Sequence, residues 1–199
     1  MKLINVLHAM FWCALFSNSV DAQRRFLEKQ EGILFGVGAA LGHGPKNSSS
    51  VSGYGSFSFT DGLEFVVSGG SVSADETTDH FSPAVEIYGS EGYLRPFVDI
   101  VYTKATHTEG TFHQSASLLA GASFDILQYR RVLLAPEIGY GMILGLGDNG
   151  ESNKPLKVWS FGLSSGIRLS KSSLVFINGG AAKTKDKWTE SIGLGIVFG

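Results

Sequence analysis

The stretch Trp188-Thr-Glu-Ser-Ile-Gly-Leu-Gly-Ile-Val-Phe198-Gly199 at the end of the chain decides the fold. With Glu190 as the one exception, large apolar side chains occupy alternate positions from Trp188 to Phe198, and the positions between carry Thr, Ser, Gly, Gly and Val. A repeat of two residues is typical of a β-strand, because successive side chains point to opposite faces. Bulky apolar residues on one face and small residues on the other predict a strand with lipid outside and a tight interior.

The first 22 residues have the features of a secretory signal. Lys2 supplies the positive start, Val6 to Phe16 is an apolar run, and Val20-Asp21-Ala22 suits a signal peptidase. The only cysteine, Cys13, falls inside this segment, so the mature chain would hold no disulfide and no cysteine metal site. We therefore expect a signal peptide at 1–22, a periplasmic lead at 23–32 and one barrel domain at 33–199.

The composition narrows the class of protein further. Charged residues make up 17% of the chain, below the ~25% of an ordinary soluble domain. The net charge of −2 argues against a nucleic-acid partner. After the signal, no stretch is long and apolar enough for a helical membrane span, so any insertion must use strands.

Working outward from the last segment, the same alternation recurs along the chain. The expected strands form a closed antiparallel up-and-down barrel of ten strands, with eight as the alternative because the run at 174–182 separates its faces poorly. Most runs match the ~9–11 residues of a tilted transmembrane strand. The runs are Ile33–Gly42, Val51–Phe59, Leu63–Val72, Phe81–Gly89, Tyr93–Lys104, Thr111–Ile126, Val132–Gly145, Leu156–Leu169, Leu174–Ala182 and Trp188–Phe198.

The connections between these runs are expected to alternate between short and long, which is the layout of outer-membrane barrels. Hairpin chemistry such as Asp61-Gly62 predicts tight periplasmic turns. The expected tight turns are Thr60–Gly62, Ser90–Gly92, Leu127–Arg131 and Ser170–Ser173, and the expected longer outer loops are His43–Ser50, Ser73–His80, Ala105–Gly110, Leu146–Pro155 and Lys183–Lys187. Pro96 and Pro136 are expected to mark bulges or irregularities, since proline lacks a ladder donor.

The charged residues inside strands mostly share the small-residue face. A bare Arg or Lys facing mid-bilayer lipid would cost ~2–4 kcal/mol, so these charges are expected to line the lumen, where opposite signs can pair. Lys104, Lys157 and Glu190 are exceptions on the apolar face, close to an outer strand end. The predicted lumen charge network is Glu64, Glu86, Arg95, Asp99, Asp125, Glu137 and Arg168.

Aromatic residues near the strand ends predict girdles at the two membrane interfaces. The predicted girdle residues are Phe81, Tyr102, Trp159, Trp188 and Phe198, with Phe57 and Phe59 also suited to the periplasmic end. Ordinary core packing is the alternative interpretation of these rings.

The signal, the strand-turn-strand-loop rhythm over Ile33–Phe198 and the aromatic end of the last strand resemble the small bacterial outer-membrane β-barrels. That group contains the opacity proteins and the OmpA-type transmembrane domain. The resemblance implies location in the bacterial outer membrane and contact with its lipids and lipopolysaccharide. It also implies insertion by machinery that reads a terminal aromatic residue, although here Gly199 follows Phe198.

Two enzyme interpretations were weighed against this background. His113 and Ser115 share a strand face with Asp125, as in some lipid A deacylases, but they face the lumen in the expected register, where that chemistry has no access to lipid. One outer loop holds Asp75, Glu76, Asp79 and His80, as an omptin-like protease would require, without a second constellation opposite it. We expect no enzyme.

The sequence therefore predicts an integral outer-membrane barrel with a structural or surface-interaction role and a narrow polar lumen. No metal-ligand spacing stands out and no cofactor is expected. A small-solute pore, a lipid-modifying enzyme and a soluble secreted barrel for an apolar ligand stay open as alternatives. An extracellular ligand for the outer loops stays open as well.

Overall fold

The computed structural model describes residues 33–60, 62–74, 77–89, 93–108, 112–129, 131–146, 155–185 and 187–199. The predicted signal peptide at 1–22 and the predicted lead at 23–32 lie outside these residues, so both stay predictions.

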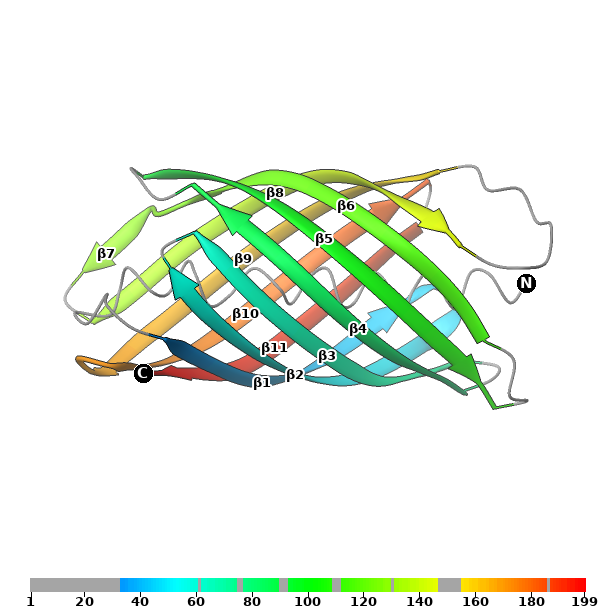
Figure 1. Ribbon diagram of the computed structural model, residues 1–199, viewed down its shortest axis with the longest axis horizontal. Coiled ribbons are helices and arrows are strands. Elements are labelled where there is room, and N and C mark those ends of the chain that lie inside the picture. Colours follow the sequence, from blue (N-terminus) through cyan, green and yellow to red (C-terminus); the bar gives the residue numbers. More distant parts are fainter. Residues whose placement is uncertain are drawn as a thin grey trace.

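The described chain is almost entirely β-strand (Figure 1). Every strand pairs antiparallel to its neighbours, and pairing of β6 with β8 closes the sheet into a barrel of ten strands, as predicted. Among the described residues, no helix has the length and apolarity to cross a membrane. The elements are β1 (Leu34–Gly44), η2 (Pro45–Asn47), β2 (Ser48–Thr60), β3 (Leu63–Ser73), β4 (Thr77–Tyr88), β5 (Leu94–His107), β6 (Phe112–Phe124), β7 (Leu127–Tyr129), β8 (Val132–Gly145), β9 (Leu156–Ser170), β10 (Ser173–Thr184) and β11 (Lys187–Phe198).

The short strand β7 is not an additional strand of the barrel, because it continues β6 along β8. It pairs with the start of β8, and β6 pairs with the rest of β8, so the two lie in line along the same edge. The predicted tight turn at 127–131 was therefore partly wrong.

Pro136 lies opposite the break between β6 and β7, while its register with Leu163 on β9 is regular. The three residues 124–126 lie opposite the two residues Ala135 and Pro136, so Pro136 sits at a strand irregularity, as expected. Pro96, by contrast, sits in regular register with Ala122, so the expectation was wrong there.

Apart from residues 146–155, which join β8 and β9 over the expected span, the connections at both ends of the barrel are short, which corrects the expected short-long alternation. At the end predicted to face outward, β1 and β2 are joined by residues 45–47, β3 and β4 by residues 74–76, and β10 and β11 by residues 185–186. Asn47 and Lys185 adopt the left-handed backbone, with φ of 56° and 52°, which closes tight turns. Polar Ser and Thr residues that resembled loops instead continue the ladders. The connection 146–155 is the longest of this set.

The outer wall of the barrel has the predicted apolar character. On β11 the outward residues Ile192 and Leu194 are 58% and 57% exposed, whereas Val197 on the opposite face is fully buried. On β2 the inward positions carry serine, except for Tyr54, whereas Val51 on the opposite face points outward. Large apolar side chains therefore cover the outside. Polar and small side chains line the inside together with buried apolar clusters, one of which contains Leu133, Leu174 and Phe176.

Glycines on the inner wall make room for two buried aromatic rings. The ring of Tyr54 lies across Gly38, where an added Cβ would come within 2.5 Å of it. At Gly195 an added Cβ would overlap the Phe176 ring and lie 2.6 Å from the Tyr54 hydroxyl. The two rings contact each other, with centroids 6.4 Å apart. The glycine-rich face predicted from β11 is thus packed by aromatics from β2 and β10.

We predict that a charge in the middle of the outer wall destabilises the protein in a lipid bilayer. Leu194→Arg should lower the free energy of folding into vesicles by ~2–4 kcal/mol, because Leu194 lies mid-strand on the outward face. The control Glu190→Arg lies nearer the strand end and should cost ~0–1 kcal/mol. Reversible urea titration in vesicles measures both values, and equal costs would contradict the lipid-facing assignment of this wall.

Candidate functional site

The predicted lumen charges come from separate strands of the inner wall. Glu64 lies on β3, Glu86 on β4, Arg95 and Asp99 on β5, and Glu137 on β8, while Asp125 follows β6. The exposed fractions of these six side chains run from 0% to 8%. Within this group carboxylates far outnumber guanidinium groups, so the inner wall is acidic.

Three of the carboxylates form one row across neighbouring strands. Glu64 pairs in register with Glu86, and Glu86 pairs with Asp99. Directly opposed side chains in an antiparallel pair have Cβ atoms ~4.5–5.5 Å apart. Both carboxylate oxygens of Asp99 are buried without a hydrogen-bond partner. We refer to Glu64, Glu86 and Asp99 as the acidic row.

Tyr88 joins this row to the buried arginine. Its hydroxyl donates to Glu86 Oε2 at 2.6 Å, and the Arg95 guanidinium lies 5.4 Å from the centroid of its ring. A cation over an aromatic face is attracted by the ring quadrupole. Sequence reasoning missed Tyr88, although its position two residues after Glu86 puts it on the same strand face.

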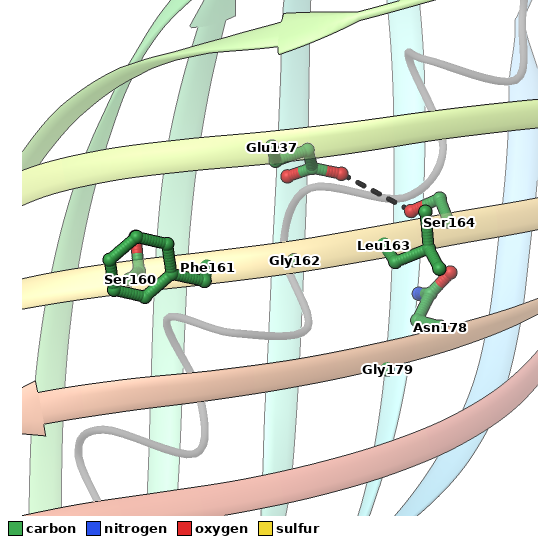
Figure 2. A pocket seen from close by; sticks show the side chains of 8 residues that line it. All are labelled: Glu137, Ser160, Phe161, Gly162, Leu163, Ser164, Asn178 and Gly179. Atoms are coloured by element: carbon green, nitrogen blue, oxygen red, sulfur yellow. Dashed lines mark hydrogen bonds between the residues drawn. The ribbon is translucent and has the colours of Figure 1, made fainter. Parts of the chain in front are cut away.

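A second row of register partners runs from Arg95 on β5 to Glu137 on β8. Arg95 on β5 pairs with Ser123 on β6, and Ser123 pairs with Glu137 on β8. Figure 2 shows Glu137 beside Ser164 of β9, whose hydroxyl donates to Glu137 Oε1 at 3.2 Å, with Asn178 on the neighbouring β10. A small polar recess opens here, and its residues are Glu137, Ser160, Phe161, Gly162, Leu163, Ser164, Asn178 and Gly179.

Arg168 belongs to a different part of the wall. It lies six residues along β9 from Gly162, the residue that pairs with Glu137. Its side chain is only half-buried, in contrast to the 1% exposure of Arg95. The register therefore places Arg95, rather than Arg168, next to the predicted carboxylates. The role of the whole set as a lumen network stays a prediction.

Histidines gather on the inner wall toward the other end of the barrel. His107 is hydrogen-bonded through Nδ1 to the Thr78 hydroxyl at 2.9 Å, and its ring meets that of His113 edge to face at 5.2 Å. Ser115 is buried on the inner wall, and Asp125 is buried beyond the end of β6. These positions match the expected register, which places His113 and Ser115 on the inner wall.

The other constellations weighed from the sequence separate in the structure. His80 is buried on the inner face of β4, whereas Asp79 is exposed on the outer face. The remaining acidic residues of that loop, Asp75 and Glu76, lie outside the described residues. In the part of the chain that the structure describes, no group of three His, Cys, Asp or Glu side chains is arranged to hold a metal ion.

Aromatic rows encircle part of the outer wall at both strand ends. At one end Phe198, Phe35, Phe57 and Phe65 are consecutive partners across β11, β1, β2 and β3. The Phe35 and Phe198 rings stack with centroids 6.1 Å apart. At the other end the row reads Trp188, Lys183, Trp159 and Tyr140 across β11, β10, β9 and β8.

The predicted girdle residues all lie on the outer wall. Phe81, Trp159, Trp188 and Phe198 are 43–52% exposed, and Tyr102 is half-exposed. The rings of Tyr140 and Trp159 have centroids 4.7 Å apart. Their membership of membrane girdles stays a prediction, but none of these residues belongs to the barrel core.

The closure, the strand count and the outward apolar wall define the class: a small closed antiparallel β-barrel of ten strands. The fold matches the translocator domain of autotransporter NalP from Neisseria meningitidis, with a TM-score of 0.56 and 10% identity over 100% of this chain and 95% of that one.

Further solved barrels are less similar. Neisserial surface protein A gives a TM-score of 0.46 at 14% identity, covering 84% of this chain and 97% of that one. The N-terminal barrel of Pseudomonas aeruginosa OprF gives 0.37 at 12%, covering 83% and 97%. No protein-family model and no curated protein matches the sequence.

We predict that Arg95 matters more to stability than Arg168. Arg95→Met should cost ~3–5 kcal/mol, because it leaves buried carboxylates without their neighbouring cation. The matched change Arg168→Met removes a half-buried cation and should cost clearly less. Urea titration followed by the heat-modifiable gel shift of the folded barrel reports both, and a larger loss in Arg168→Met would overturn this assignment.

Proposed function

We propose that the protein is an integral β-barrel of the bacterial outer membrane, with a structural, non-enzymatic role and a narrow polar lumen. The outward apolar wall carries this proposal. A water-soluble barrel for an apolar ligand would need the opposite arrangement, with its apolar side chains inside. The inward position of Ser115 and His113 supports a role without lipid-modifying chemistry.

The spacing of the two aromatic rows supports membrane insertion. Trp188 and Phe198 belong to opposite rows and are separated by ten residues of β11. At ~3.3 Å per residue and a tilt of ~35–45°, this distance projects to ~25 Å along the barrel axis, which equals the apolar band of outer-membrane barrels. The rows therefore suit the two interfaces of one bilayer.

The direction of insertion follows from the barrel's own topology. β1 begins and β11 ends at the same end of the barrel, where Phe35 and Phe198 pair. A chain that arrives from the periplasm would leave this end on the periplasmic side, since the strand count is even. The opposite connections are short, which favours a structural role over a dedicated surface adhesin. Any extracellular contact would fall mainly on the connection 146–155.

Cell fractionation tests the proposed location. The protein should sediment with outer membranes, resist extraction by alkaline carbonate and require detergent for solubility. It should also migrate differently on gels before and after boiling, as closed barrels do. Recovery as a soluble monomer without detergent would refute the proposal.

A small cation-selective pore is the second candidate, favoured by the acidic row. We predict that, if the lumen conducts, planar bilayers will show cation-selective channels. Glu86→Gln with Asp99→Asn should then lower the cation preference, because the double variant removes two buried carboxylates without changing side-chain size. The reversal potential in a salt gradient measures the preference. Absence of conductance for folded protein would eliminate the pore and leave the structural role.

A further inference from the structure

A basic and aromatic patch lies on the outer wall at the end opposite the start of β1 and the end of β11. Lys183 on β10 is flanked in register by Trp188 on β11 and Trp159 on β9. Its ammonium group lies 5.6 Å from the centroid of the Trp188 ring. Lys157 is two residues from Trp159 on the same outward face, and Lys185 occupies the adjoining turn. We call these five residues the Lys-Trp patch.

The charges in this patch do not cancel within the described outer wall. Lys157 and Lys185 are exposed, and Lys183 is half-exposed. Lys157 lies diagonal to Lys183, because Lys183 pairs with Trp159; diagonal neighbours on a sheet are ~7–8 Å apart. On the described outer face of β9 to β11, Glu190 is the one carboxylate. It pairs with Ala181 and is thereby a diagonal neighbour of Lys183, whose own partner is Trp188. Three lysines against this one carboxylate leave the described part of the patch with a net positive charge.

The wall next to the patch is apolar and suits acyl chains. Beyond the tryptophans, the same three strands present Phe161, Leu163, Ile177, Ile192 and Leu194, which are 40–58% exposed. The Phe161 and Trp188 rings are 6.1 Å apart, so the aromatic platform runs directly into this surface. Positive charge, indole rings and aliphatic side chains thus follow one another along the wall, in the order of head group, interface and chain in a lipid.

We propose that the Lys-Trp patch binds the phosphate-bearing head group of lipopolysaccharide, with its acyl chains along the aliphatic wall. The inference rests on the proposed outer-membrane location, because the patch lies at the end assigned to the outer leaflet. Lysine ammonium groups bind phosphate as compact point charges. The adjoining apolar surface selects an amphiphile over free phosphate.

The patch contains its own spectroscopic probe. Two of the three tryptophans in the chain, Trp159 and Trp188, belong to it, and the third is Trp12. Protein purified from outer membranes and exchanged into a non-ionic detergent is titrated with purified lipid A while tryptophan emission is recorded. Lipid A should shift the emission saturably. Lys157→Gln with Lys183→Gln should weaken binding on the order of tenfold or more, since each lysine near a lipid phosphate contributes ~1 kcal/mol.

Controls separate the contributions to binding. Lys171→Gln makes the same change in the β9–β10 turn at the opposite end and should bind as the wild type does. Lipid A stripped of its phosphates should bind as weakly to the wild type as intact lipid A binds to the double variant. Inorganic phosphate alone should leave the emission unchanged. A heat-modifiable gel shift verifies that each variant is folded.

The inference is overturned if the folded double variant binds lipid A like the wild type, or if phosphate-free lipid A binds equally well. A response to inorganic phosphate alone would also overturn it, because the site would then be a simple anion site. Failure of the outer-membrane proposal appears instead in cell fractionation, which does not depend on either lysine.

Discussion

The alternation of apolar and polar side chains around a closed hydrogen-bonded ring is the constraint on which the rest of the structure depends. Each of the ten barrel strands finds partners on both edges through the β6–β8 closure, so their paired backbone needs no water in the plane of the sheet. The wall can then be apolar on its outside. Once the outside is apolar, charged residues in mid-strand have only the interior available, and this places the acidic row where it lies.

Because these charged side chains and some aromatic ones point inward, they must be packed and partnered inside the barrel. Carboxylates on adjacent strands repel one another, and Arg95 with the Tyr88 hydroxyl and ring offsets part of that repulsion at the row. Elsewhere the wall is thinned by glycine so that large rings lie flat against it, as Tyr54 does over Gly38. The small residues and the buried aromatics therefore pack together. The Tyr54 ring on β2 lies against Gly38 on the consecutive strand β1, and its hydroxyl also reaches Gly195 on β11, which is far away in sequence.

The sequence predicts the strands and their faces well, because a period of two is local. The alternation within the run 188–198 is enough to predict which of its side chains face outward. The same alternation within their own strands predicts that Glu86 and Asp99 face inward. The turn lengths were harder to predict: Ser48 to Ser50 and Thr77 to His80 look like polar loops but continue the ladders, since inward polar residues are normal in this barrel. Tyr88 and the β6–β7 break depend on which strands become neighbours, and periodicity within one strand carries no such information.

The distribution of residue types over the outer wall indicates which part of the surface would contact other molecules. Short turns such as 45–47 and 185–186 add little chain beyond the strand ends, so most of the exposed side chains among the described residues lie on the wall. That wall is not uniform: lysines and indoles gather where β9, β10 and β11 approach one end, and phenylalanines gather at the other. In the proposed outer-membrane setting, this asymmetric wall would make lipid the partner with the largest contact area. Specificity is then to be sought in the lipid-facing residues before the loops.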